Sequence, residues 1–184
     1  MGRRGRLRWA ANQAQQVLDE HGGRSGVVRG RKVDVHALLP FMGIQYSEKP
    51  LGNDTSGMCL IKNGRAAVVV NQDHHMNRKR FTAAHELGHY IMHSGEIEVF
   101  LDAHGDKTQR VYRNGQSSLG TDPMEVEANN FASALLMPAE AVQQAWSARV
   151  GNRFAEDQDV AQLARWFQVS RIAMSLRLQA LRLL

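Results

Sequence analysis

The feature that most constrains this chain is the segment His-Glu-Leu-Gly-His at residues 85–89, which lies in a stretch with helical periodicity. Two residues four positions apart on a helix share a face and lie about 6 Å apart, so His85 and His89 can both bind one Zn²⁺. Glu86 then lies beside the open coordination position, where a carboxylate can accept a proton from water. The neighbouring residues are mostly apolar, and burying such a polar cluster is costly unless a metal satisfies it. The segment therefore predicts a helix with a zinc site, in the HExxH pattern of zinc peptidases.

A catalytic zinc site needs a third protein ligand, and the helix predicted over residues 122–137 offers two candidates. Glu125 and Asn129 are four positions apart, so one face would present a carboxylate to the metal and an amide to orient a ligating imidazole. Glu127 is a rival that lies about 200° round the helix from Glu125. The Glu125 face has the smaller side chains, so we predict Glu125 as the ligand. Its alternative role is a capping box with Asp122.

Other polar residues near the histidines could support the chemistry. His93 repeats the four-residue interval, but eight residues of helix rise about 12 Å, too far for one ion to bind it together with His85. We expect His93 to support a ligand from behind or to lie at the helix end. The oxyanion of a hydrolytic reaction needs a positioned donor, and Tyr90, His93, Tyr112 and Arg113 are candidates among which the sequence does not choose.

The predicted architecture is α+β and mostly helical, with a small antiparallel sheet. An Asn-Gly pair at residues 63–64 lies between two apolar runs, which predicts a hairpin near residues 58–71 packed on the helix of the histidines. Its second strand, residues 66–71, could be an edge that receives an extended peptide. The polar segment 94–121 is expected to be a loop with one short strand at residues 111–112.

Helices are predicted for most of the remaining chain. We divide it into a basic N-terminal helix and linker, residues 1–32, and one domain, residues 33–184. The linker is the Gly/Ser/Arg stretch at residues 23–30, and Asn77 is the predicted cap of the histidine helix. The expected helices are an exposed one at 7–20 and others at 33–42, 78–93, 122–137, 138–149, 157–166 and 170–183.

The C-terminal segment, residues 157–184, has two interpretations. Its spacing is that of a helix-turn-helix, with Ser170 capping a recognition helix that carries Arg171 and Arg177. Residues 160–184 contain four arginines and no acid, which suits nucleic acid but equally suits a solvated helix face. In the alternative interpretation the two helices close the core with their apolar residues, namely Leu163, Phe167, Ile172, Leu176 and Leu183.

Composition excludes several classes of protein. Hydrophobic residues make up 43% of the chain and charged residues 22%, as in ordinary globular domains. The longest apolar run is about five residues, whereas a membrane span needs about 20. The basic N-terminus lacks the apolar region of a secretory signal, and the single Cys59 allows no internal disulfide. We expect a cytoplasmic protein without a membrane partner.

Beyond the histidine segment itself, the chain carries three features in a fixed order, namely Asn71, then residues 78–93, then residues 125–138. This order of motifs resembles the ImmA/IrrE family of zinc metallopeptidases. The tail, residues 162–178, is similar to the usual end of that family. The resemblance covers roughly residues 33–184.

This resemblance implies a zincin-like domain with a thermolysin-like site. In such a site His85, His89 and Glu125 bind Zn²⁺ and Glu86 is the general base. It further implies an endopeptidase that cleaves a regulatory protein, such as a helix-turn-helix repressor, and so acts as an anti-repressor in transcription regulation. The alternative function is a DNA-binding or repressor-binding module that uses the basic C-terminus, with a structural or inactive metal site.

Overall fold

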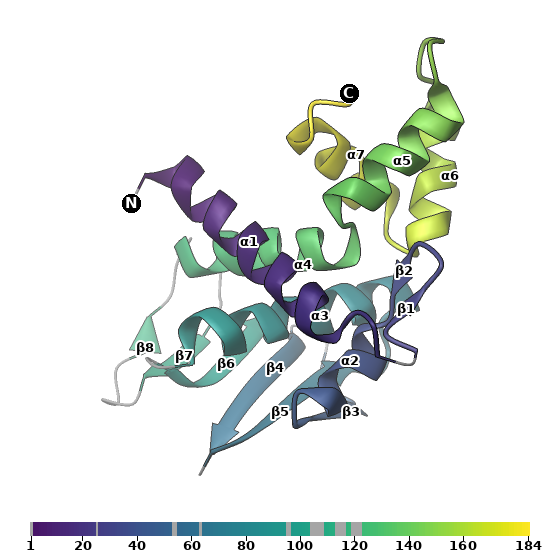
Figure 1. Cartoon of the computed structure of the whole chain (residues 1–184). Coiled ribbons are helices and arrows are strands. Elements are labelled where there is room, and N and C mark those ends of the chain that lie inside the picture. The colour runs from purple at the N-terminus through teal and green to yellow at the C-terminus, as the bar shows by residue number, and fades with distance from the viewer. Residues whose placement is uncertain are drawn as a thin grey trace.

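The computed structural model describes residues 2–24, 26–52, 55–62, 64–94, 97–103, 109–112, 117–118 and 123–184. All the described strands precede the fourth helix, and the last three described helices follow it (Figure 1). The elements are, in chain order, α1 (Arg3–His21), β1 (Val28–Arg29), β2 (Lys32–Val33), α2 (Val35–Phe41), β3 (Ile44–Lys49), β4 (Thr55–Lys62), β5 (Arg65–Asn71), α3 (Met76–His93), β6 (Ile97–Ala103), β7 (Gln109–Tyr112), β8 (Ser117–Ser118), α4 (Pro123–Leu136), α5 (Ala139–Val150), α6 (Asp157–Phe167) and α7 (Arg171–Ala180).

Among the described residues, six strands form a mixed sheet in the order β3-β5-β4-β6-β7-β8. β4 and β5 form the predicted hairpin, with Lys62 paired to Arg65 beside the turn. The predicted α+β fold is confirmed. The sheet extends beyond the hairpin on both sides, because β3 pairs in parallel with β5 and β6 pairs antiparallel with β4. β5 thus has a neighbour on each side, and its predicted role as an edge strand is wrong. A turn signal in the sequence predicts which two strands form a hairpin. It does not predict which strand pairs with the other edge of β5, because that depends on contacts between distant parts of the chain.

The segment predicted as a loop with one strand contains three described strands. β6 pairs with β4, β7 pairs with β6, and β8 pairs with β7, all antiparallel. The predicted strand at residues 111–112 is the end of β7. β6 was missed although Ile97, Val99 and Leu101 alternate along it, because the polar residues around that short signal dominate the composition.

The N-terminal helix α1 is part of the core, which corrects its prediction as an exposed helix. Ala10, Ala14 and Val17 are buried along one side of α1, and α1 crosses over α4 in Figure 1. The Asn130 side chain donates a hydrogen bond to the carbonyl of Leu7, which links the two helices directly. Small side chains at helical spacing let two helices approach closely, so sparse apolar content here reflects tight packing rather than exposure.

Helix α3 lies between the sheet and α4, with contacts to β4 and β5 on one side and to α4 on the other (Figure 1). Two glycines permit this tight packing. A Cβ atom at Gly88 would lie 3.1 Å from Cδ1 of Phe131 and 3.3 Å from Cα of Ala128, both in α4. A Cβ atom at Gly57 in β4 would collide with the methyl group of Thr82 in α3. A helix held this closely on both sides is a rigid platform for its polar side chains.

Arg80 joins three parts of the chain from the buried side of α3. Its guanidinium donates to the carbonyls of Phe167 at 3.1 Å, of Gln168 and of Val33 at 2.7 Å. Burial lowers the pKa of Arg80 from its ordinary value. A buried cation is tolerated when several carbonyl dipoles accept from it, so this arginine is a structural clamp between α3, the end of α6 and β2.

The remaining helix predictions agree with the structure to within a few residues. α2, α5, α6 and α7 occupy the expected stretches, and β1 with β2 forms a short hairpin at the end of the predicted linker. The division of the chain at residue 32 stays a prediction. Within the part of the chain that the structure describes, no helix has the length and apolar character needed to cross a membrane.

Candidate metal centre

Helix α3 is anchored at its start and carries five of the predicted site residues, namely His85, Glu86, His89, Tyr90 and His93. His75 caps the helix, with its Nδ1 accepting from the backbone N–H of Asn77 at 3.2 Å. The prediction of Asn77 as the cap is wrong, because its side chain instead donates to the carbonyl of Val169 at 3.2 Å. This contact fixes α3 against the loop between α6 and α7, about two turns before the histidines.

The structure brings His85, His89 and Glu125 together in one buried group. One possible ligand atom from each lies within 4.8 Å of the others. Nε2 of His85 is 3.0 Å from Nε2 of His89 and 3.2 Å from Oε2 of Glu125, and Nε2 of His89 is 3.0 Å from Oε1 of Glu125. Among the described residues this is the group of His, Cys, Asp or Glu that could hold a metal ion.

These separations fit a tetrahedral zinc site. Ligand atoms about 2.0–2.1 Å from a tetrahedral Zn²⁺ lie about 3.3 Å from one another. The three distances of 3.0–3.2 Å are close to that value. The donor set of two imidazoles and one carboxylate is one that catalytic zinc sites use, with a fourth position left for water. The residues present therefore fit the ion that the sequence predicts.

Asn129 sets the orientation of one imidazole. Its Oδ1 lies 3.1 Å from Nδ1 of His85, one turn of α4 beyond Glu125. An amide oxygen can only accept, so Nδ1 of His85 carries the proton and Nε2 presents a lone pair towards His89 and Glu125. This is the tautomer that a metal requires. The contact lies where we predicted it, and the role of Asn129 as the partner of a metal ligand stays a prediction.

The protonation states of the group also suit a cation. Burial lowers the pKa of His89 to about 3, although Glu125 opposes this shift. Burial by itself would raise the pKa of Glu125, but its close contacts with the imidazoles of His85 and His89 outweigh burial and hold that pKa below its usual range. A neutral imidazole beside an ionised carboxylate is the form that binds a metal without first losing protons.

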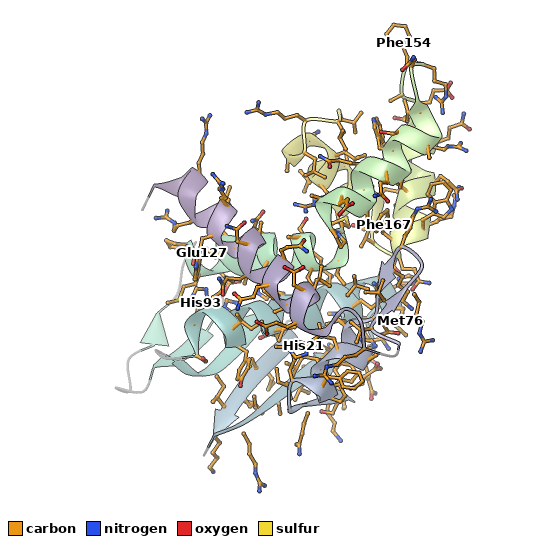
Figure 2. The ribbon with its side chains drawn as sticks, in the orientation of Figure 1. His21, Met76, His93, Glu127, Phe154 and Phe167 are labelled. Carbon is orange, nitrogen blue, oxygen red and sulfur yellow. The ribbon has the colours of Figure 1, made fainter. Side chains whose placement is uncertain are left out.

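The rival Glu127 faces the opposite way from Glu125, towards α1. Its carboxylate is 3.4 Å from Nε of Arg6 and 3.6 Å from Nε2 of His93, and Figure 2 shows Glu127 and His93 side by side next to α1. The ring of His93 is tilted against that of His89, with centroids 5.6 Å apart, and its centroid lies 6.4 Å from that of Trp9. His93 therefore lies behind the ligand group, as its helical rise predicts.

Glu86 is completely buried on the side of α3 that faces β4. Its Oε1 lies 3.6 Å from the position that a Cβ atom at Gly57 would occupy. The neighbouring Cys59 thiol has its pKa raised by burial and further by the charge of Glu86. Sequence reasoning missed the close approach of Gly57, although a glycine inside a strand pattern is a known signal for one.

The predicted oxyanion donors are only partly described. Tyr90 is half-buried against the core. The side chain of Tyr112 and the whole of Arg113 lie outside the described residues. Which of these groups, or His93, donates to an oxyanion stays a prediction.

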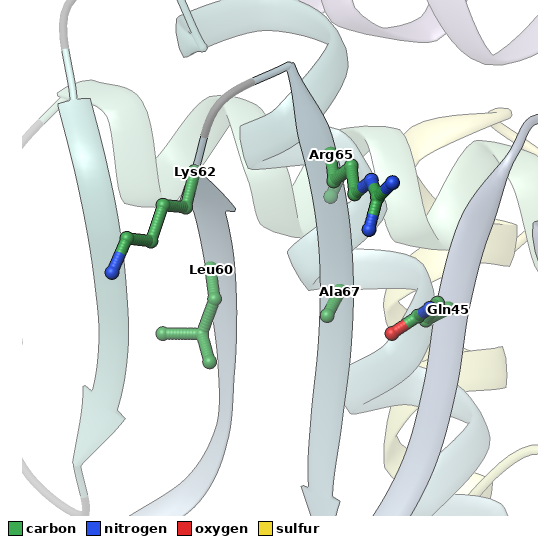
Figure 3. A pocket seen from close by; sticks show the side chains of 6 residues that line it. Gln45, Leu60, Lys62, Arg65 and Ala67 are labelled. Atoms are coloured by element: carbon green, nitrogen blue, oxygen red, sulfur yellow. The ribbon is translucent and has the colours of Figure 1, made fainter.

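Two hollows lie outside the ligand group. One, of about 570 Å³, is on the sheet face turned away from α3, where Gln45, Leu60 and Ala67 form a row across three strands (Figure 3). Lys62 and Arg65 lie at its end. The other, also of about 570 Å³, lies between the first half of α3 and α7. Alternate residues of a strand face opposite sides, so the first hollow is separated from Glu86 by the sheet.

The C-terminal helices only partly match a DNA-reading motif. Ser170 caps α7 as predicted, with its hydroxyl accepting from the N–H of Ala173, and Arg171 is exposed. Arg177, however, is 7% exposed and donates to the carbonyl of Met137 at 2.9 Å. The prediction that Arg177 lies on a recognition surface is wrong, because this guanidinium satisfies a buried carbonyl of the peptidase core.

Fold and ligand group together define a class of protein, a mostly helical, zincin-like α+β domain of the metallopeptidase type. A family model described as the IrrE N-terminal-like domain, a peptidase family, matches residues 42–179. The chain belongs to this family, which confirms the resemblance found in the sequence. A search of the curated proteins found no match. Membership supports a peptidase that acts on a protein substrate.

Proposed function

We propose that this protein is a zinc-dependent endopeptidase. The observation that supports this most strongly is the convergence of His85, His89 and Glu125 at distances of 3.0–3.2 Å, with Glu86 next in the chain to a ligand. A Zn²⁺ ion bound there would supply a Lewis acid and lower the pKa of a water molecule. Three protein ligands leave a position for that water, which separates a catalytic site from a closed structural one.

Glu86 is the proposed general base. It accepts a proton from the water that attacks the peptide carbonyl, and it passes the proton to the nitrogen of the departing amine. Its burial among α3 and β4 excludes bulk solvent from this exchange. Asn129 holds His85 in the correct tautomer throughout.

The proposed substrate is a regulatory protein in the cytoplasm, such as a helix-turn-helix repressor, whose cleavage would relieve repression. This part of the proposal is supported by the resemblance to ImmA/IrrE proteins and by membership of a peptidase family. DNA binding by the chain itself has less support, because the buried side chain of Arg177 donates a hydrogen bond to the carbonyl of Met137 and does not face a DNA-binding surface. An electrophoretic mobility measurement with duplex DNA tests that alternative.

The decisive test compares wild-type protein with Glu86→Gln and His85→Ala. Each is incubated with a candidate repressor, first one encoded beside this chain, and the products are identified by mass spectrometry. We expect Glu86→Gln to keep its zinc but to lose cleavage by about 10²–10⁴-fold, since an amide accepts no proton. His85→Ala should lose the zinc as well. Full turnover by Glu86→Gln would assign the base elsewhere.

A further inference from the structure

The hollow between α3 and α7 has an apolar wall that faces solvent. Phe81 lines it from α3, and Ile172, Ala173 and Leu176 line it from α7. Ile172 is 74% exposed and Leu176 is 60% exposed. These two residues are four positions apart, so they form one apolar stripe on the open side of the helix.

This exposure departs from the expectation that Ile172 and Leu176 close the core. The opposite side of α7 does that instead, through Met174 and Leu178, which are completely buried. Large apolar side chains that line a concave surface without being covered mark a place where another apolar group binds.

The hollow lies next to the proposed active site along α3, one helical turn before Glu86. Thr82 lines it and lies four positions before Glu86, so the two side chains share a face of the helix about 6 Å apart. Ser56 lines it too, next to Gly57, the point at which β4 approaches Glu86. From Glu86 back to Asn77, the far lining residue of α3, the helix rises about 13 Å.

Resting on the proposed function, we propose that this hollow is a subsite that binds bulky apolar side chains of the polypeptide substrate. An extended chain covers about 3.3 Å per residue, so the hollow reaches substrate residues about two to four positions from the scissile bond. Ile172 and Leu176 are then the residues of α7 that select the substrate. A volume of about 570 Å³ accommodates more than one such side chain.

Charge argues against a second copy of this chain as the occupant. Residues 160–184 carry no acid, and Arg165, Arg171 and Arg182 are exposed there, so two such surfaces would repel each other. Among the described lining residues none is acidic, and one of them, Arg78, is an exposed cation. An apolar segment with neutral or acidic neighbours in the substrate suits this lining better than another basic surface does.

The test uses a synthetic library of randomised dodecapeptides as the probe. Zinc-loaded wild-type protein is assayed for cleavage, and zinc-loaded Glu86→Gln, immobilised, is assayed for peptide retention. Each background is compared with Ile172→Asp/Leu176→Asp, whose exposed positions tolerate a charge. Phe154→Asp is the matched control, because Phe154 is 95% exposed on the loop between α5 and α6, away from this hollow (Figure 2).

We expect Leu, Ile, Phe and Met to be enriched about tenfold at positions two to four from the cleaved bond, and among retained peptides. The double aspartate variant should replace this preference with one for Lys and Arg, while Phe154→Asp keeps it. An unchanged preference in the double variant, or none in the wild type, overturns the subsite.

Two further outcomes separate this inference from the proposed function. Retention that depends on Ile172 and Leu176 without any cleavage would support the subsite and count against the peptidase. Cleavage without an apolar preference would support the peptidase and overturn the subsite. Sedimentation of the protein alone completes the test, because a dimer that dissociates in the double aspartate variant would show that a second copy covers the hollow.

Discussion

Two acidic side chains, Glu125 in α4 and Asp159 in α6, lie in contrasting environments. Asp159 accepts from Arg149 at 2.8 Å, from Arg153 at 2.6 Å and from the backbone N–H of Glu156 at 3.0 Å. The hydrogen bond from Arg153 is the largest cause that lowers its pKa. Glu125 instead meets the imidazole nitrogens of two histidines. The carboxylate of Asp159 is therefore bound by two guanidinium groups, which are always charged. The carboxylate of Glu125 contacts the nitrogen atoms of neutral imidazoles.

The difference shows how a structural acid can be told from a ligand. Guanidinium groups complete the charge and the hydrogen bonds of Asp159, so that cluster joins α5 to α6 without any added ion. At Glu125, by contrast, the lone pair on Nε2 of His85 points towards the Glu125 carboxylate and towards His89. These groups are all acceptors, and a bound cation stabilises such a set. The contrast predicts that a metal matters to one site and not to the other.

Glu125→Ala should give the largest effect, because it removes one of three protein ligands. We expect zinc affinity to fall by several orders of magnitude, measured by competition with a chelator. Glu125→Gln should also weaken binding, since a neutral amide is a poorer ligand than a carboxylate. If Glu125→Ala keeps full zinc while melting at a lower temperature, Glu125 is only a helix cap.

Asp159→Asn should lower thermal stability by the same amount with and without zinc. The variant leaves Arg149 and Arg153 beside a neutral amide, while the ligand group is untouched. The pKa of Asp159 is lowered on folding, so its contribution is full above about pH 4 and is lost as the pH falls further towards the folded pKa. Melting curves should therefore show that wild type loses its advantage over Asp159→Asn in acid. A zinc-dependent difference would contradict the assignment.

Asn129→Ala should have an intermediate effect on the metal. Without the amide, His85 is free to change tautomer and to rotate, so we expect zinc affinity to fall by about 10–100-fold. Asn129→Asp can still accept from Nδ1 and should restore much of the affinity. Unchanged zinc binding in Asn129→Ala would show that the contact at 3.1 Å does not orient the ligand.

Glu127→Ala should have the smallest effect. It removes the contacts with Arg6 and His93 but leaves the ligand group in place, so zinc affinity should stay within error of the wild type. Unfolding free energy should fall by at most about 1 kcal/mol, because Arg6 is partly exposed and can turn to water. If chelator competition shows loss of zinc here and not in Glu125→Ala, the helix face has been assigned wrongly.

Several elements were predictable because their signals are local. The hairpin followed from an Asn-Gly turn between apolar runs, and the spacing of His85 and His89 predicted one helical face. Glu125 was favoured over Glu127 because small side chains on its face allow a close approach to α3, and in the structure it is Glu125 that contacts Nε2 of His85 and of His89. The polar segment after α3 was misjudged because a short alternation in β6 carries little weight against its neighbours.

The sequence by itself therefore determined two things. It showed which residues have the chemistry to bind a metal, and its periodicity showed which of them share a face of one helix or strand. Tertiary structure alone decided that β3 joins the hairpin in parallel, that α1 packs over α4, and that Arg177 is buried while Ile172 and Leu176 face solvent. The physical reason is that periodicity places a residue on a face of its own element. Which other element covers that face depends on contacts between residues far apart in the chain, and no local pattern encodes them.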